Sequence, residues 1–159
     1  TSGSNFQPVS CFNYSCCSID FANNKWIAVG IQQILGVKSV AYSISTDATA
    51  TTWSKPVTIN SLNFYEQNLT IKYGYGNVWM IGGRGTTHNY LVSTNNGSSW
   101  TPIGGNSLIG VFGIRYIDNT WYSYGYNSTL LKSTDNGKTW VSIDLSSYFN
   151  YIYCLGWNG

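Results

Sequence analysis

The sequence predicts an all-β chain built from β-propeller blades, each a sheet of four antiparallel strands. One phrase, Ser-Thr-x-Asn-Gly-x-x-Trp, occurs at residues 93–100 and 133–140, and a degenerate copy occupies residues 45–53. These segments, which we call the first (45–53), second (93–100) and third (133–140) repeat turns, recur at roughly the 40 to 50 residues of a propeller blade. No stretch sustains the apolar spacing of an amphipathic helix beyond two turns. A second tryptophan recurs with the same period, at Trp26, Trp79 and Trp121.

Each repeat turn is predicted to be the tip of a β-hairpin. Asp and Asn side chains accept backbone N–H groups two residues further on, and Gly supplies the positive φ angle that closes the turn. Short apolar runs flank the turns, at 90–92 and 129–131 before them and at 100–103 and 140–143 after them. The tryptophan that ends each turn is expected to pack back beneath it, into the sheet of the same blade.

The second tryptophan marks the second strand of each blade, at residues 24–30, 77–83 and 119–125. A first strand precedes each of them, around residues 14–20, 68–73 and 109–116. With the strands on either side of the repeat turn, this makes four strands per period, the number in a propeller blade. The first blade is longer at residues 31–38, where we expect an inserted loop between its second and third strands. Trp26 is expected to belong to the core of this blade.

Residues 1–159 are therefore predicted to form a single propeller segment of about three full blades with part-blades at both ends. Three blades leave open sheet edges, whereas propellers generally close with four to eight. We expect a segment of a longer propeller, in preference to a homo-oligomer that completes its ring by assembly. The predicted blades are 12–60, 61–105 and 106–147, with 1–11 as the last strand of a preceding blade and 148–159 as the first strand of a following one.

The repeat turns resemble the Asp-box, or BNR repeat, of sialidase-like β-propellers, whose pattern is Ser-x-Asp-x-Gly-x-Thr-Trp. The third turn matches it fully, the second has Asn in place of Asp, and the first has no Gly and one extra residue. The resemblance implies that the turn joins the third and fourth strands of a blade, away from the ligand-binding face, and is structural. The residues to which it assigns this role are Asp47, Trp53, Asn95, Gly97, Trp100, Asp135, Gly137 and Trp140.

The composition describes a well-packed domain with a neutral, hydrogen-bonding surface. Charged residues make up 9% of the sequence, aromatic residues 16%, and the net charge is +2. Because the basic residues form no cluster, nucleic acids and anionic membranes are not expected as partners. No apolar run approaches the roughly 18 residues of a membrane-spanning helix. Low charge with abundant Tyr, Asn and Thr favours an extracellular or virion-surface location.

Cysteines and glycosylation motifs add little to this assignment. Cys11, Cys16, Cys17 and Cys154 show no zinc-site spacing, so we expect neither a metal nor a cofactor, while disulfides remain possible. Acceptor motifs for N-glycosylation occur about as often as chance predicts. The candidate glycosylation sites are Asn13, Asn68 and Asn127.

Rare polar residues gather in the loops that join second to third strands and fourth to first strands. By the same resemblance, these loops share the ligand-binding face. They contain the sole Glu and the sole His of the sequence together with one arginine. Such a group could bind an acidic or sugar ligand, although exposed loops carry polar residues in any case. The candidate ligand-binding residues are Lys38, Tyr65, Glu66, Arg84 and His88.

The function predicted from the sequence is a non-catalytic scaffold or binding module, with a protein or a glycan as partner. Its many aromatic residues could stack on sugars, although packing in the blade core accounts for most of them. The alternative is part of a sialidase-like glycoside hydrolase. That activity, as the family implies, uses three arginines, a Tyr with its Glu, and an acid/base Asp. Because the sequence has only Arg84 and Arg115, we assign no catalytic residue and favour a protein that is not an enzyme.

Overall fold

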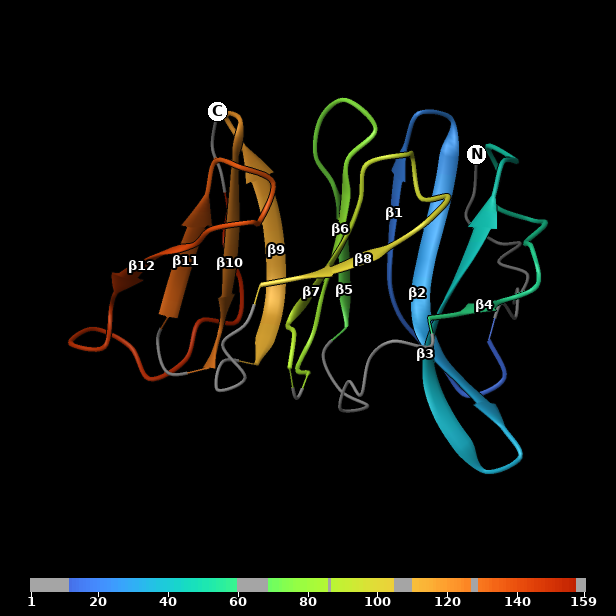
Figure 1. The fold of residues 1–159 in the computed structure, drawn as a ribbon, viewed down its shortest axis with the longest axis horizontal. Helices are drawn as coiled ribbons and strands as arrows, with labels where there is room; N and C mark the ends of the chain where they lie inside the picture. Colours follow the sequence, from blue (N-terminus) through green and yellow to red (C-terminus); the bar gives the residue numbers. More distant parts are fainter. Residues whose placement is uncertain (1–11, 60–68, 86, 105–109, 127–128, 157–159) are drawn as a thin grey trace, which may run out of the picture.

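The computed structural model describes residues 12–59, 69–85, 87–104, 110–126 and 129–156 (Figure 1). These residues form three four-stranded antiparallel sheets, and no α-helix occurs among them. Within the same ranges there is no helix long and apolar enough to cross a membrane. The predicted all-β fold of propeller blades is confirmed.

Each sheet is a meander in which the strands pair in chain order. In blade 1 these strands are β1 (Ser15–Ala22), β2 (Lys25–Ile34), β3 (Val37–Ser45) and β4 (Val57–Thr58). In blade 2 they are β5 (Thr70–Tyr73), β6 (Trp79–Gly82), β7 (Tyr90–Ser93) and β8 (Thr101–Ile103). In blade 3 they are β9 (Val111–Ile117), β10 (Thr120–Gly125), β11 (Thr129–Ser133) and β12 (Val141–Asp144).

The three blades stand side by side, and their first strands lie next to one another. Strand β1 contacts β5, and β5 contacts β9. The connections from first to second strands lie at the upper edge of Figure 1, whereas the β2–β3 hairpin points to the lower edge. The β1–β2 and β9–β10 turns have two consecutive residues with positive φ, Asn23–Asn24 and Asp118–Asn119. This geometry suits the right-handed twist of paired strands.

The hydrophobic core lies between the blades. One cluster joins blades 1 and 2 and includes Ile27, Ile71 and the fully buried Trp79. A second cluster joins blades 2 and 3 and includes Met80 and Trp121, of which 0% and 1% are exposed. Each sheet thus buries an apolar face against the next, and blade 1 has in addition a small cluster of its own, in which Phe12, Ala28 and Ala41 pack with Trp53.

The three blades share one register, which defines equivalent positions. Their second-strand tryptophans each pair with an aromatic residue of the first strand and with a serine that begins the repeat turn. Corresponding residues can therefore be compared between blades. The equivalent sets used below are Ile19, Ile71 and Ile114; Tyr42 and Tyr90; Thr58 and Gly104; Ile81 and Ser123; and Ser98 and Lys138.

The prediction of an inserted loop at residues 31–38 is wrong. Strands β2 and β3 continue through this stretch and pair as far as Ile34 and Val37. The chain reverses at Leu35 and Gly36, which both have positive φ. Apolar Ile34, Leu35 and Val37 are exposed along this extension, so its length reflects strand pairing and not burial.

Two expectations for the tryptophans also need correction. Trp26 is only half-buried and lies against the exposed Phe21, with ring centroids 4.7 Å apart, because no described residue covers that face of blade 1. The tryptophans of the second and third repeat turns do lie on their own blades, but they also contact the preceding one. Trp100 meets Tyr42 of blade 1, and Trp140 stacks on Tyr90 of blade 2.

The C-terminal segment lies along blade 3 without forming the predicted strand. The Ile152 N–H donates to the Gly125 carbonyl at 3.3 Å, and the Arg115 Nε donates to the Leu155 carbonyl at 3.2 Å. Residues 1–11, predicted to end a preceding blade, lie outside the described residues. Among the described cysteines, Cys16, Cys17 and Cys154 are exposed.

Candidate functional site

The third repeat turn is held by its own side chains. Asp135 Oδ1 accepts the Thr139 N–H at 2.9 Å and the Ser133 hydroxyl at 2.8 Å, while Oδ2 accepts the Thr139 hydroxyl at 2.6 Å. Ser133 Oγ in turn accepts the Gly137 N–H at 2.9 Å. The Thr139 hydroxyl, followed by its N–H, lowers the pKa of the Asp135 carboxyl to about 2. The carboxylate thus closes the hairpin.

The second turn repeats this arrangement with an amide. Asn95 Oδ1 accepts the Ser99 N–H and the Ser93 hydroxyl, both at 2.9 Å. In the first turn Asp47 accepts from the hydroxyls and N–H groups of Thr49 and Thr51, which hold the pKa of its carboxyl well below the usual range. The extra residue of this turn is therefore accommodated around the same carboxylate.

The repeat turns also anchor the tryptophans of the second strands. Trp79 Nε1 donates to Asn96 Oδ1 at 2.9 Å, and Trp121 Nε1 donates to Asn136 Oδ1 at 3.2 Å. In blade 1, Trp26 Nε1 donates to the Ala48 carbonyl at 3.3 Å. Each turn is thereby bonded to the second-strand tryptophan of its own sheet, which is buried in blades 2 and 3 and half-buried in blade 1.

The turn glycines press against the preceding blade. Gly97 and Gly137 both have φ of 81°. A Cβ at Gly97 would lie 2.3 Å from Ile27 Cδ1, and one at Gly137 would lie 2.7 Å from Met80 Cε. Both the conformation and the lack of space favour glycine. The turns therefore have no free surface at these points and contribute to packing between blades.

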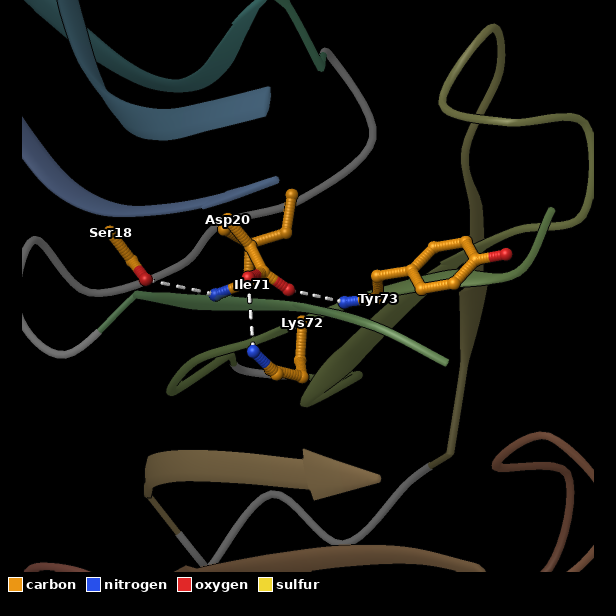
Figure 2. A network of polar contacts seen from close by, with 5 residues as sticks. All are labelled: Ser18, Asp20, Ile71, Lys72 and Tyr73. Carbon is orange, nitrogen blue, oxygen red and sulfur yellow. Dashed lines mark hydrogen bonds and ion pairs between the residues drawn. The ribbon is translucent and has the colours of Figure 1, made fainter. Parts of the chain in front are cut away.

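A polar network bridges the first strands of blades 1 and 2 (Figure 2). Asp20 Oδ1 pairs with Lys72 Nζ at 2.9 Å, and Asp20 Oδ2 accepts the Tyr73 N–H at 2.7 Å. Ser18 Oγ accepts the Ile71 N–H at 3.2 Å. These contacts satisfy backbone N–H groups on the edge of β5, which has no strand partner on that side. The network is structural, because every group in it faces a neighbouring blade.

Of the predicted ligand-binding residues, Lys38 and Arg84 each contact a tyrosine. Lys38 belongs to β3, and its Nζ donates to the Tyr14 hydroxyl at 2.7 Å. Arg84 follows β6 and is exposed. His88 lies in the same β6–β7 connection, with Nδ1 3.0 Å from the Thr87 hydroxyl. Tyr65 and Glu66 lie outside the described residues.

Arg84 lies over a group of aromatic rings that we call the Arg84 cluster, formed by Arg84, Phe112, Tyr126, Tyr151 and Tyr153. The guanidinium carbon is 5.8 Å from the centre of the Tyr126 ring. Phe112 meets Tyr126 at 4.5 Å between centroids and stacks on Tyr153 at 5.3 Å with 5° between the planes. Tyr151 and Tyr153 are 48% and 71% exposed, so the cluster presents a cation beside accessible aromatic faces.

This cluster gathers parts of the chain that sequence spacing did not connect. Arg84 was predicted as a ligand-binding residue, but Tyr151 and Tyr153 fall in a stretch predicted as a strand. Their alternation, with every second residue aromatic, was a usable signal, since it places both rings on one side of an extended segment. The partner surface, Phe112, is contributed by β9 and could be found only from the structure.

The candidate glycosylation and metal sites offer less. The Asn13 side chain bonds to both the N–H and the carbonyl of Gln33, at 2.8 and 2.7 Å. Asn68 and Asn127 lie outside the described residues. Within the described ranges there is no group of three or more His, Cys, Asp or Glu residues that could hold a metal ion.

Comparison with known proteins extends to the fold alone. No protein-family model matches the sequence, and no curated protein matches it significantly. Among solved structures, YCF48 bound to a D1 peptide is similar, with a TM-score of 0.59 and 19% identity over 80% of this chain and 40% of that one. The computationally designed Ika8 protein gives 0.53 and 8% over 80% and 35% of the two chains. A Trypanosoma rangeli sialidase gives 0.49 and 14% over 79% and 27%.

The similarity to YCF48, a propeller, confirms a β-propeller fold. The chain spans well under half the length of each of the three structures. At such low identity, the activities and ligands of those proteins do not transfer to this chain.

Proposed function

We propose that this chain is a set of Asp-box propeller blades that serves as a non-catalytic scaffold or binding module. The repeat turns support the Asp-box assignment, because in each hairpin the side chain of Asp135, Asn95 or Asp47 accepts the backbone N–H four residues further on. The glycines and the Asp or Asn side chains of the turns are occupied by packing and hydrogen bonds. The binding role proposed here is therefore assigned to another part of the blades.

The observation that carries the binding role is the Arg84 cluster. It combines an exposed guanidinium with the exposed faces of Tyr151 and Tyr153. Arginine and tyrosine are enriched at the centres of interfaces because each offers a broad apolar surface with a polar end. Such a surface suits a protein segment or a glycan that carries an acidic group. YCF48, whose structure contains a bound D1 peptide, provides a precedent for peptide binding on this fold.

The binding role is tested with two acidic probes, a library of short acidic peptides and 3′-sialyllactose. Binding of either probe to the chain should weaken at least tenfold in Arg84→Ala and in Tyr153→Ser. Lys138→Ala, in the third repeat turn, is the matched control and should bind as the wild type does. If neither probe binds, or if the control loses as much affinity as Arg84→Ala, the cluster is not the binding surface.

We further propose that additional blades of the same protein cover the open face of blade 1. Ile19 and Phe21 on β1 are 47% and 42% exposed, whereas Ile71 and Ile114, equivalent to Ile19, are 3% and 2% exposed because a preceding blade covers them. A mass of the native protein about twice 17.6 kDa or more supports this assignment. A native mass of 17.6 kDa with a ring formed by several copies would contradict it in favour of a homo-oligomer.

An extracellular or virion-surface location is part of the same proposal and rests on the low charge of the sequence. Detection of the native protein on intact cells or particles by surface biotinylation tests it. Hydrolysis of a fluorogenic sialoside by the native protein would instead support the glycoside hydrolase alternative and overturn the non-catalytic role.

A further inference from the structure

We propose that the groove between blades 1 and 2, on the side of the second repeat turn, is a binding site for a neutral saccharide. The groove has a volume of about 450 Å³, within the range of roughly 300 to 1,000 Å³ typical of ligand pockets. Tyr42 and Thr58 line it from blade 1, and Ser98, Ser99 and Trp100 line it from blade 2. It lies apart from the Arg84 cluster, which is formed by blades 2 and 3 and the C-terminal segment.

The equivalent position between blades 2 and 3 is filled by side chains. There Tyr90 stacks on Trp140 with centroids 4.6 Å apart and 21° between the planes. The Tyr90 hydroxyl donates to Ser123 Oγ at 2.8 Å, and a Cβ at Gly104 would lie only 2.8 Å from the Tyr90 ring. The stacked pair thus depends on an acceptor at Ser123 and on the absence of a side chain at Gly104.

Both conditions change between blades 1 and 2. The position of Ser123 is occupied by Ile81, which offers no acceptor, and the position of Gly104 is occupied by Thr58. Tyr42 accordingly meets Trp100 edge-on, with centroids 5.8 Å apart and 60° between the planes. Two differences in sequence therefore open a groove at one interface that its counterpart closes.

The lining matches the surface of a sugar. Trp100, which is half-buried, provides aromatic surface that can pack against the apolar C–H face of a pyranose ring, whereas Tyr42 is 8% exposed and offers only a small part of its ring. The hydroxyls of Thr58, Ser98 and Ser99 provide donors and acceptors that match sugar hydroxyls. Two further lining residues, Val57 and Ile59, are aliphatic. A few placed polar groups on a mainly apolar wall is the composition of a specific small-molecule site.

The residues that line the groove disfavour charged ligands. None of the described residues that line the groove carries a charge. A carboxylate or phosphate placed there would lose hydration without gaining an opposite charge. Ser98 is equivalent to Lys138 of the third turn, so the closed interface has a cation at the position where the open one has a hydroxyl. The occupant expected here is therefore uncharged.

The test follows the indole N–H signals of the full chain by ¹H–¹⁵N NMR during titration with lactose, cellobiose and N,N′-diacetylchitobiose. At least one of these disaccharides should shift the Trp100 signal saturably while leaving the Trp140 signal in place. Ser98→Lys, which introduces the residue that the third turn already carries, should weaken binding at least tenfold without unfolding the chain. Lys138→Ser, the reciprocal change at the closed interface, should leave the affinity unchanged.

Three results would overturn the proposal. The first is no saturable shift of Trp100 with any of the three disaccharides. The second is equal affinity in the wild type and Ser98→Lys. The third is binding of an uncharged apolar probe, N-phenyl-1-naphthylamine, in the groove without competition from any disaccharide, which would assign the groove to an apolar partner. Because Arg84→Ala leaves this groove intact, loss of acidic-ligand binding and loss of disaccharide binding are separable.

Discussion

Replacing Ile71 by alanine should cost about two to five times as much stability as replacing Ile19, although the two residues occupy equivalent positions. Ile71 is 3% exposed within the cluster between blades 1 and 2, whereas Ile19 is 47% exposed. Removing three buried carbons costs about 2.4 kcal/mol at roughly 0.8 kcal/mol per methylene. The cavity that remains at Ile71 brings the loss to about 2 to 5 kcal/mol. At Ile19, half of the side chain is already in water and no enclosed cavity forms, so about 1 kcal/mol is expected.

The assay is urea unfolding of the 159-residue chain, followed by tryptophan fluorescence and far-ultraviolet circular dichroism. Ile114→Ala, at the third equivalent position with 2% exposure, should match Ile71→Ala and serves as the internal replicate. Equal losses for Ile19→Ala and Ile71→Ala would refute the reasoning, since they would show that packing between blades does not determine the stability of these positions. In a native protein with a further blade over Ile19, the difference between the variants should disappear.

Three further predictions concern the turns and the network between blades. Asp135→Asn should flatten the pH dependence of stability between about pH 4 and 2. The pKa of this carboxyl is 3.8 ordinarily and about 2 in the folded chain, so between these values the unfolded state binds more protons than the folded state. The wild type therefore loses stability as the pH falls through this range, and the variant lacks the group responsible. Trp140→Ala should cost about 2 to 4 kcal/mol in urea unfolding, since it removes a partly buried ring stacked on Tyr90. Asp20→Ala should cost about 1 to 3 kcal/mol by leaving a backbone N–H and an ammonium without their acceptor.

Each of these has a control. Asn95 fills the position of Asp135 in the second turn with the same contacts, so Asp135→Asn is expected to fold, and an unchanged pH profile would contradict the assigned role of the carboxylate. For the stacked ring, Trp140→Phe should recover more than half of the loss. For the network, Lys72→Met should cost less than Asp20→Ala, because Asp20 would keep the Tyr73 N–H. Equal losses from these two variants would assign the whole effect to the ion pair.

The sequence was sufficient for the blades because their pattern is local and repeated. A turn closed by Asp135 or Asn95 and a tryptophan on each second strand both follow from short spacings, and both occur as predicted. The loop expected at residues 31–38 failed because strand pairing depends on a partner segment, and the exposed apolar residues there carry no alternation that marks a strand. Alternation of apolar and polar residues identifies a strand that buries one of its two faces, whereas the exposed apolar residues of this extension bury neither face.

The candidate site was only partly predictable, because it depends on contacts between blades. Arg84 was identified as a rare charge in a loop, and the ring it lies over, Tyr126, follows β10; the further rings of the cluster come from β9 and from the C-terminal segment. The groove at Tyr42 depends on Ile81 and Thr58, which are distant in the sequence from each other and from Trp100. Only the register between strands shows that these residues replace Ser123 and Gly104.

The interfaces at Tyr42 and at Tyr90 are two copies of the same contact between neighbouring blades. With two copies, the contact that holds the blades together and the opening that could admit a ligand can lie at different interfaces. An aromatic pair that stacks tightly secures the seam between neighbouring sheets but leaves no room for anything else. Because the chain has two copies of this interface, one can remain closely packed while the other loses part of its aromatic contact and becomes accessible. A ligand-binding groove can then arise by loosening the packing at one existing interface between blades, with no new loop and no added residue.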